Sequence, residues 1–264
     1  MTAVGSWRNE YSSVLEIRTQ TPSGEFQGTY RSHTGASGTY RVSGWAPQST
    51  REQGNRPFCL CVSWKPIDGA EVDPSWNWLS VMPGVLFLDV PGGAHQIRVL
   101  HGLVAATTLE AVMIRRPGVY AETLTFQKLA LPSQAPSVSD KNMGEAATTR
   151  QLVLTNQNKS AAYRKIVLWT SSDGVARAKI EKEDEVIDAR GFSDPAHHGN
   201  LQALALGGLM GSASIRAISI GGFINTNDKN AVLQLWEAES VSYQNKYTAV
   251  KIGQETFSVS FRRN

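Results

Sequence analysis

The sequence has little of four things: cysteine, long apolar runs, helical periodicity and charge of one sign. Its two cysteines, Cys59 and Cys61, are too few for the disulfide framework of a small secreted domain. They are two residues apart and therefore share one face of an expected strand, so we predict that both are small buried hydrophobes. No apolar run reaches the roughly 20 residues that cross a bilayer, which argues against a membrane-spanning helix.

The charge is mixed and weakly basic. Lys and Arg number 26 against 23 Asp and Glu, which gives a net charge of +3. Readers of nucleic acid gather their basic residues in a patch, whereas Arg262 and Arg263 form only a short basic end. We therefore expect no nucleic-acid partner and no membrane partner. Residues 1–20 lack the basic start, apolar block and cleavage site of a signal peptide, which predicts a cytoplasmic protein unless a leader has been removed.

Motifs for cofactors and metals are also missing from the sequence. It contains no P-loop, no dinucleotide fingerprint and no G-x-S-x-G motif. His33, His95 and His101 have no spacing that commits them to a metal, and the histidine pair at 197–198 lies in an expected loop. The sequence therefore predicts neither a cofactor nor a metal site.

Strand signals fill the chain instead, as β-branched and aromatic residues alternate with polar ones between Gly, Pro, Asn and Asp breaks. In the first half they fall at 13–20, 25–30, 38–45, 58–64, 76–81, 85–90, 96–104, 108–115 and 120–131. In the second half they fall at 151–156, 164–170, 175–182, 185–192, 201–206, 215–223, 232–238, 247–252 and 255–261. Short strands with close turns predict an all-β protein built as an antiparallel up-and-down barrel, which leaves no exposed edge.

A Pro- and Ser-rich polar segment at 132–149 divides the chain almost in half and is the best linker candidate. Both halves follow the same strand rhythm, and the segment from Tyr120 to Phe126 resembles the one from Tyr247 to Phe257. We therefore predict two divergent barrels in tandem, at 1–131 and 150–264. A single larger barrel with an insertion is the alternative.

Polar and aromatic residues recur at fixed places in the early strands. They occur in Gly5-Ser6-Trp7-Arg8-Asn9, in the segment from Gly24 to Ser32, and in Val62-Ser63-Trp64-Lys65. Tryptophans that wall the mouth of a small barrel, with hydroxyls and an amide that orient a ligand, would hold one small molecule. The candidate ligand-binding residues are Asn9, Ser13, Tyr30, Ser32, Trp64, Trp76 and Trp78.

These segments resemble the first strands of the avidin/streptavidin family, over about the first 80 residues. The second half resembles that family's last three strands, with candidate site residues at Trp236, Tyr247 and Glu255. The resemblance implies two avidin-like, calycin-type barrels. It also implies that Asn9, Ser13 and Tyr30 would donate hydrogen bonds to one carbonyl oxygen, the ureido oxygen of biotin. Such converging donors are strongest where water is excluded.

The sequence departs from the family where a closing aspartate would accept from a ureido N–H. Leu124 stands near that position in the first half, and leucine cannot accept, whereas Glu255 occupies it in the second half. Losing one partner of such a buried bond costs about 1.5–3 kcal/mol, or roughly ten- to a hundredfold in affinity. The first pocket is thus expected to bind biotin more weakly than the family does, or to take another carbonyl-bearing ligand.

Three functions follow as hypotheses. The first is a non-catalytic protein that binds biotin or another carbonyl- or ureido-bearing molecule, with the second barrel as an assembly partner and a homo-oligomer as a further possibility. The second is a cofactor-free cyclase or isomerase that polarises a substrate carbonyl, with Glu10, His33 and Asp89 as candidate acids and bases. The third is a carbohydrate-binding module with Trp76 and Trp78 as a stacking platform.

Overall fold

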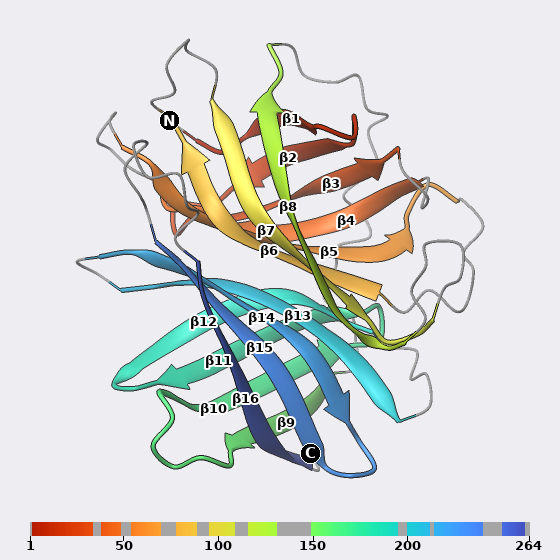
Figure 1. Ribbon diagram of the computed structural model, residues 1–264, viewed down its shortest axis with the longest axis vertical. Helices are drawn as coiled ribbons and strands as arrows, with labels where there is room; N and C mark the ends of the chain where they lie inside the picture. Colours follow the sequence, from red (N-terminus) through yellow and green to blue (C-terminus); the bar gives the residue numbers. More distant parts are fainter. Residues whose placement is uncertain are drawn as a thin grey trace.

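The computed structural model describes the chain in ten stretches, and every structural statement below concerns these residues. They are 2–33, 38–48, 54–69, 78–88, 95–108, 116–130, 149–194, 200–211, 214–239 and 250–261. Sixteen strands form two closed antiparallel barrels of eight strands each, stacked on one another in Figure 1. The prediction of an all-β tandem of barrels is therefore confirmed. The described residues include no helix long and apolar enough to cross a membrane.

The first barrel runs in sequence order and closes where β1 pairs with β8. Its strands are β1 (Gly5–Asn9), β2 (Val14–Gln20), β3 (Glu25–Ser32), β4 (Gly38–Trp45), β5 (Arg56–Pro66), β6 (Trp78–Phe87), β7 (Gln96–Ala105) and β8 (Gly118–Lys128).

The second barrel repeats this order and closes where β16 pairs with β9. Its strands are β9 (Thr149–Asn156), β10 (Tyr163–Ser171), β11 (Val175–Lys182), β12 (Glu185–Ser193), β13 (Leu201–Met210), β14 (Arg216–Asn225), β15 (Asn230–Glu239) and β16 (Val250–Phe261). The predicted linker falls almost entirely on residues 131–148, which lie outside the described stretches.

Equivalent hairpins join the second and third strands of each barrel. Gly24 N–H donates to the carbonyl of Thr21, and Gly174 N–H donates to the carbonyl of Ser171. Each glycine has a positive φ, 96° for Gly24 and 86° for Gly174, a conformation that favours glycine. Thr21-Pro22-Ser23-Gly24 thus forms one of the Gly- and Pro-containing breaks expected between strands, and the shared turn aligns β3 with β11 residue by residue.

Two predicted strand breaks are wrong. The segments 76–81 and 85–90 were expected as separate strands, but Met82, Pro83 and Gly84 continue one strand, β6. Proline is tolerated there because the β6–β7 register skips from Val81 to Gly84, so Pro83 has no partner residue on β7. Likewise, 250–261 forms the single strand β16 through Gly253. Most of the strand expected at 108–115 lies outside the described residues.

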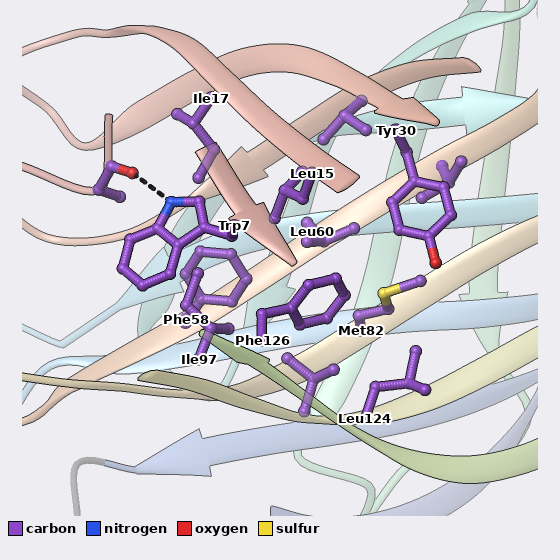
Figure 2. Close-up of a cluster of buried hydrophobic side chains, with 14 of the residues drawn as sticks. Trp7, Leu15, Ile17, Tyr30, Phe58, Leu60, Met82, Ile97, Leu124 and Phe126 are labelled. Atoms are coloured by element: carbon purple, nitrogen blue, oxygen red, sulfur yellow. Dashed lines mark hydrogen bonds between the residues drawn. The ribbon is translucent and has the colours of Figure 1, made fainter. Parts of the chain in front are cut away.

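Inward-facing side chains fill the first barrel with a continuous apolar core. Trp7 lies at one side of the labelled cluster in Figure 2, and its indole N–H donates to the carbonyl of Ala3 at 3.0 Å. Tyr30 lies at the other side, with Phe126 between them. The centroids of the Tyr30 and Phe126 rings are 6.4 Å apart. On this side, the apolar core therefore ends at the hydroxyl group of Tyr30.

Outward-facing side chains of β5, β6 and β7 pack against β13, β14 and β15 of the second barrel. Cys61, Val81 and Val104 meet Ala203, Ala205 and Trp236 in one buried cluster between the barrels. Cys59 is fully buried there as well, and its thiol lies 3.7 Å from the carbonyl of Gly208. Burial raises the pKa of Cys59 to about 12, so both cysteines behave as the small buried hydrophobes predicted.

Two ion pairs flank this interface. Arg41 of β4 contacts Asp173 in the β10–β11 turn at 3.0 Å, and Arg190 of β12 contacts Glu25 at the start of β3 at 2.6 Å. In each case an arginine on the fourth strand of one barrel reaches the hairpin that joins the second and third strands of the other barrel. The two barrels thus meet through similar surfaces, as the subunits of a twofold dimer do.

Candidate functional site

One end of the first barrel brings together most of the residues singled out in the sequence. Asn9 ends β1, Ser13 precedes β2, and Tyr30 and Ser32 lie at the end of β3. Trp64 lies near the end of β5 and Trp78 begins β6. All six side chains are buried. Trp76 lies outside the described residues. We call this end of the barrel the first mouth.

The Asn9 side chain is held by the backbone around it. Its Oδ1 accepts hydrogen bonds from the backbone N–H of Tyr11 at 3.1 Å and of Ser13 at 2.8 Å. Since two amide donors fix the oxygen, the NH2 group must face the other way, and Nδ2 lies 3.3 Å from the Tyr30 hydroxyl. The β1–β2 turn therefore aims one amide donor at the oxygen of Tyr30.

Ser13 reaches the same oxygen. Its hydroxyl accepts from the backbone N–H of His33 at 3.2 Å, which leaves its proton to donate. Burial raises the pKa of the Tyr30 phenol, and hydrogen bonds from Ser13 and Asn9 oppose that rise. Asn9, Ser13 and Tyr30 thus form one cluster, as the sequence suggested. Tyr30 stays protonated and can itself donate.

Aromatic rings wall this cluster on one side. Trp64 meets the edge of Tyr30 at a centroid distance of 5.8 Å and Tyr40 at 4.8 Å. The Tyr40 hydroxyl is buried and has no hydrogen-bond partner among the described residues, and burial raises its pKa to about 12. Tyr40 pairs with Tyr30 across β3 and β4, so it is a further donor at the first mouth that the sequence analysis missed.

Behind Trp64 runs a hydrogen-bonded chain that was also missed. The Trp64 indole N–H donates to Ser80 Oγ at 2.8 Å, and Ser80 Oγ lies 2.8 Å from His101 Nε2. His101 Nδ1 lies 2.9 Å from Glu122 Oε1. Because an indole only donates and a carboxylate only accepts, Ser80 Oγ accepts from Trp64 and His101 donates from Nδ1 to Glu122.

This chain fixes Trp64 and links the interior to solvent. Ser80 is fully buried, while the Glu122 side chain is 49% exposed. The hydrogen bond from His101 lowers the pKa of Glu122, and burial opposes that effect. Strand alternation could have placed His101 inside, since Ile97 and Val99 on the same strand also face the core. Its pairing with Glu122 needs the β7–β8 register.

Trp78 and Leu124 also bear on the hypotheses drawn from the sequence. Trp78 is 5% exposed and its indole N–H donates to Thr107, so it offers no open face for stacking a sugar. Leu124 lies opposite Val99 with its side chain in the core, where the resemblance would place an acceptor. The first mouth therefore has several hydrogen-bond donors, and Leu124 offers no side-chain acceptor at the position where the resemblance would place one.

In the second barrel, the candidate site residues Glu255 and Trp236 do not lie in the same place. Glu255 lines a cavity at the equivalent end, which we call the second mouth, and accepts from Asn156 Nδ2 at 3.3 Å. Trp236 does not lie in this cavity, because its neighbours Leu235 and Glu237 face inward and alternation turns it outward. It packs between the barrels instead. Tyr247 lies outside the described residues. No group of three or more His, Cys, Asp or Glu that could hold a metal occurs among the described residues.

Comparison with known proteins agrees with the sequence resemblance. Residues 1–78 match the model of the Avidin family. Similar solved structures include apo shwanavidin, with 20% identity, a TM-score of 0.36, and coverage of 49% of this chain and 100% of that one. Xenavidin has 22% identity, a TM-score of 0.37, and coverage of 48% and 96%.

A biotin binding protein from chicken has 20% identity, a TM-score of 0.37, and coverage of 48% of this chain and 94% of its own. Each solved structure thus corresponds to about half of this chain. A search of curated proteins found no match. The resemblance of the N-terminal segment to the avidin family is confirmed for the 78 residues that the family model covers.

Proposed function

We propose that the first barrel binds a small molecule through a carbonyl or ureido oxygen at the first mouth, with biotin as the reference ligand. The observation that carries this proposal is the cluster of donors. Asn9 Nδ2 and the Ser13 hydroxyl both point at the Tyr30 oxygen, and the Tyr30 O–H is a third donor beside them. A carbonyl oxygen between these groups would accept several hydrogen bonds in a site from which water is largely excluded.

Aromatic side chains support the same proposal. Trp64 is held by Ser80 and faces Tyr30 and Tyr40, which would give the apolar part of a ligand a rigid wall. The match of residues 1–78 to the Avidin family suggests the ligand class. Leu124 argues for weaker binding than a mouth with a carboxylate there would give.

Calorimetric titration with biotin and with 2-imidazolidinone, the smallest cyclic urea, tests this proposal. We expect both to bind, and Tyr30→Phe or Asn9→Ala to weaken binding by roughly tenfold each, about the net value of one buried hydrogen bond. Tyr11→Phe is the matched control, because it also removes a tyrosine hydroxyl, from a side chain that is 50% exposed in the β1–β2 turn. Equal affinities of the wild type and Tyr30→Phe would reject the site.

The enzymatic hypothesis gains one candidate base from the structure. His101 belongs to a Ser-His-Glu chain. It was not among the acids and bases expected from the sequence, which were Glu10, His33 and Asp89. Both ring nitrogens of His101 are already occupied, by Ser80 and Glu122, and Ser80 is shielded by Trp64. A substrate proton would reach a nitrogen of His101 only after one of these two hydrogen bonds broke. We therefore retain binding as the proposed function.

A further inference from the structure

The second mouth differs from the first at equivalent positions. Asn9 pairs with Phe126 and Asn156 pairs with Phe257, which aligns β1 and β8 with β9 and β16. In this alignment Leu124 corresponds to Glu255. Ser32 ends β3 as Lys182 ends β11, and Trp78 begins β6 as Arg216 begins β14. Hydroxyl, indole and leucine are thus replaced by an ammonium, a guanidinium and a carboxylate.

A cavity of about 360 Å³ occupies the second mouth. Its size is at the lower end of the range of ligand pockets in proteins. The turn between β11 and β12 consists only of Glu183 and Asp184, so it does not fold over the opening. Ala162, Leu235 and Gly253 contribute neutral surface, and the other lining residues are Tyr163, Lys182, Glu183, Arg216, Glu237, Lys251 and Glu255.

One wall of the cavity carries an excess of positive charge. Glu237 is the shared partner of Lys182 at 3.4 Å and Arg216 at 3.0 Å, and it accepts from the Tyr163 hydroxyl at 2.9 Å. Lys182 is 5% exposed and Glu237 7%, so these charges are almost fully removed from water. A second carboxylate, Glu239, lies 4.0 Å from Arg216 but is 58% exposed. A buried Lys182 and a half-buried Arg216 around one buried carboxylate favour an additional anion.

Another wall, on β16, carries a half-buried carboxylate, Glu255, and the exposed Lys251. Glu255 accepts one hydrogen bond from Asn156, whose Nδ2 also donates to the carbonyl of Tyr163 at 2.8 Å. Among the described residues Glu255 forms no ion pair. A carboxylate with only a neutral donor can accept from a ligand ammonium or N–H group. A simple anion would face Glu255, and a simple cation would face Lys182 and Arg216.

We propose that the second mouth binds a small zwitterion of amino-acid size, with its carboxylate at Lys182 and Arg216 and its ammonium at Glu255. Such a ligand satisfies both walls and keeps the cavity neutral. A largely apolar ligand would leave buried charges without water, which is unfavourable. This site is separate from the first mouth, and its ligand is held by two opposite charges and not by a carbonyl or ureido oxygen.

The experiment is a calorimetric titration with a series of amino acids whose charges are increasingly far apart: glycine, β-alanine, 4-aminobutyrate and 6-aminohexanoate. Butyrate and butylamine each present one of the two charges and serve as controls. We expect one member of the series to bind at least tenfold more tightly than either control. A series in which no member exceeds both controls overturns the proposal.

Variants connect that binding to the cavity. Lys182→Met and Glu255→Gln should each weaken binding of the best zwitterion at least tenfold, while Lys179→Met should leave it unchanged. Lys179 is on the same strand but is 56% exposed and pairs with Asp188 outside the cavity. If Lys182→Met does not fold, Arg216→Gln replaces it. Unchanged affinity in Glu255→Gln, or loss of binding in Tyr30→Phe of the first mouth, contradicts the assignment.

Discussion

Trp236 of the second barrel packs against Gly102 of the first, and the two residues hold equivalent positions. β7 ends at Ala105 and β15 at Glu239, so each residue lies three positions before the end of its strand. A Cβ on Gly102 would lie 3.4 Å from two indole carbons of Trp236 and 3.0 Å from Val81 Cγ2. The missing side chain on one barrel thus makes room for the large side chain on the other.

This contact predicts that Gly102→Leu destabilises the pair of barrels. The added side chain would overlap the indole and Val81, and such overpacking typically costs about 1–3 kcal/mol. The free energy of unfolding from urea titration measures the effect. Gly253→Leu is the control, because a Cβ there meets no atom within 4 Å and both changes add the same strand-favouring side chain. Equal stabilities of the two variants would contradict this account of the interface.

The ion pair between Arg190 and Glu25 should contribute to holding the barrels together. Both side chains are 20% exposed and the atoms are 2.6 Å apart. A double-mutant cycle with Arg190→Met and Glu25→Gln should give a coupling energy of about 0.5–3 kcal/mol, as for residues in contact. The same cycle at Lys179 and Asp188, which are 56% and 72% exposed, should give about 0–1 kcal/mol. A larger coupling at the exposed pair would refute the expectation.

Glu122 should contribute a pH-dependent increment of stability. The bond from His101 lowers the pKa of Glu122 in the folded protein, so the folded state favours the carboxylate. The stabilisation is therefore present above the unfolded pKa of about 4.3 and is lost as the pH falls through the lower folded value. The difference in unfolding free energy between the wild type and Glu122→Gln should shrink between pH 6 and pH 3. A difference that grows on acidification would have the wrong sign.

Leu124 should limit the affinity of the first mouth for ureido ligands. Leu124→Asn introduces a neutral acceptor and should tighten 2-imidazolidinone binding by about tenfold, the value of one added hydrogen bond. The same change should cost about 2–5 kcal/mol of stability, because Leu124 is 3% exposed in the core. Leu124→Ala removes the same side chain without adding an acceptor, so a similar gain in that variant would show that space, and not the acceptor, limits binding.

Much of the fold could be predicted from the sequence, because alternation and turn residues report local structure directly. The hairpin at Gly24 and the pair Cys59 and Cys61 are examples. The strand break expected at Pro83 was wrong, because a proline without a partner residue on β7 does not interrupt pairing with the strand on its other side. Whether a strand continues through a proline thus depends on the register of the neighbouring strands, which cannot be read from composition.

The site was predictable only in part, for the same reason. Asn9, Ser13 and Tyr30 lie near one another in sequence and follow a known motif, and the structure brings them together. The chain from Ser80 through His101 to Glu122 joins three strands, and Glu237 with its partners Lys182, Arg216 and Tyr163 joins four. These groups meet only once the barrels close. Trp236 was expected in a pocket, but the inward direction of Leu235 and Glu237 turns it toward the other barrel.

The most direct measurement for the central claim is a crystal structure of the protein with 2-imidazolidinone bound. The urea oxygen should lie within about 2.7–3.2 Å of Asn9 Nδ2, Ser13 Oγ and Tyr30 Oη, with the ring against Trp64. Density for the ligand elsewhere, or a ligand oxygen out of reach of these three atoms, would contradict it.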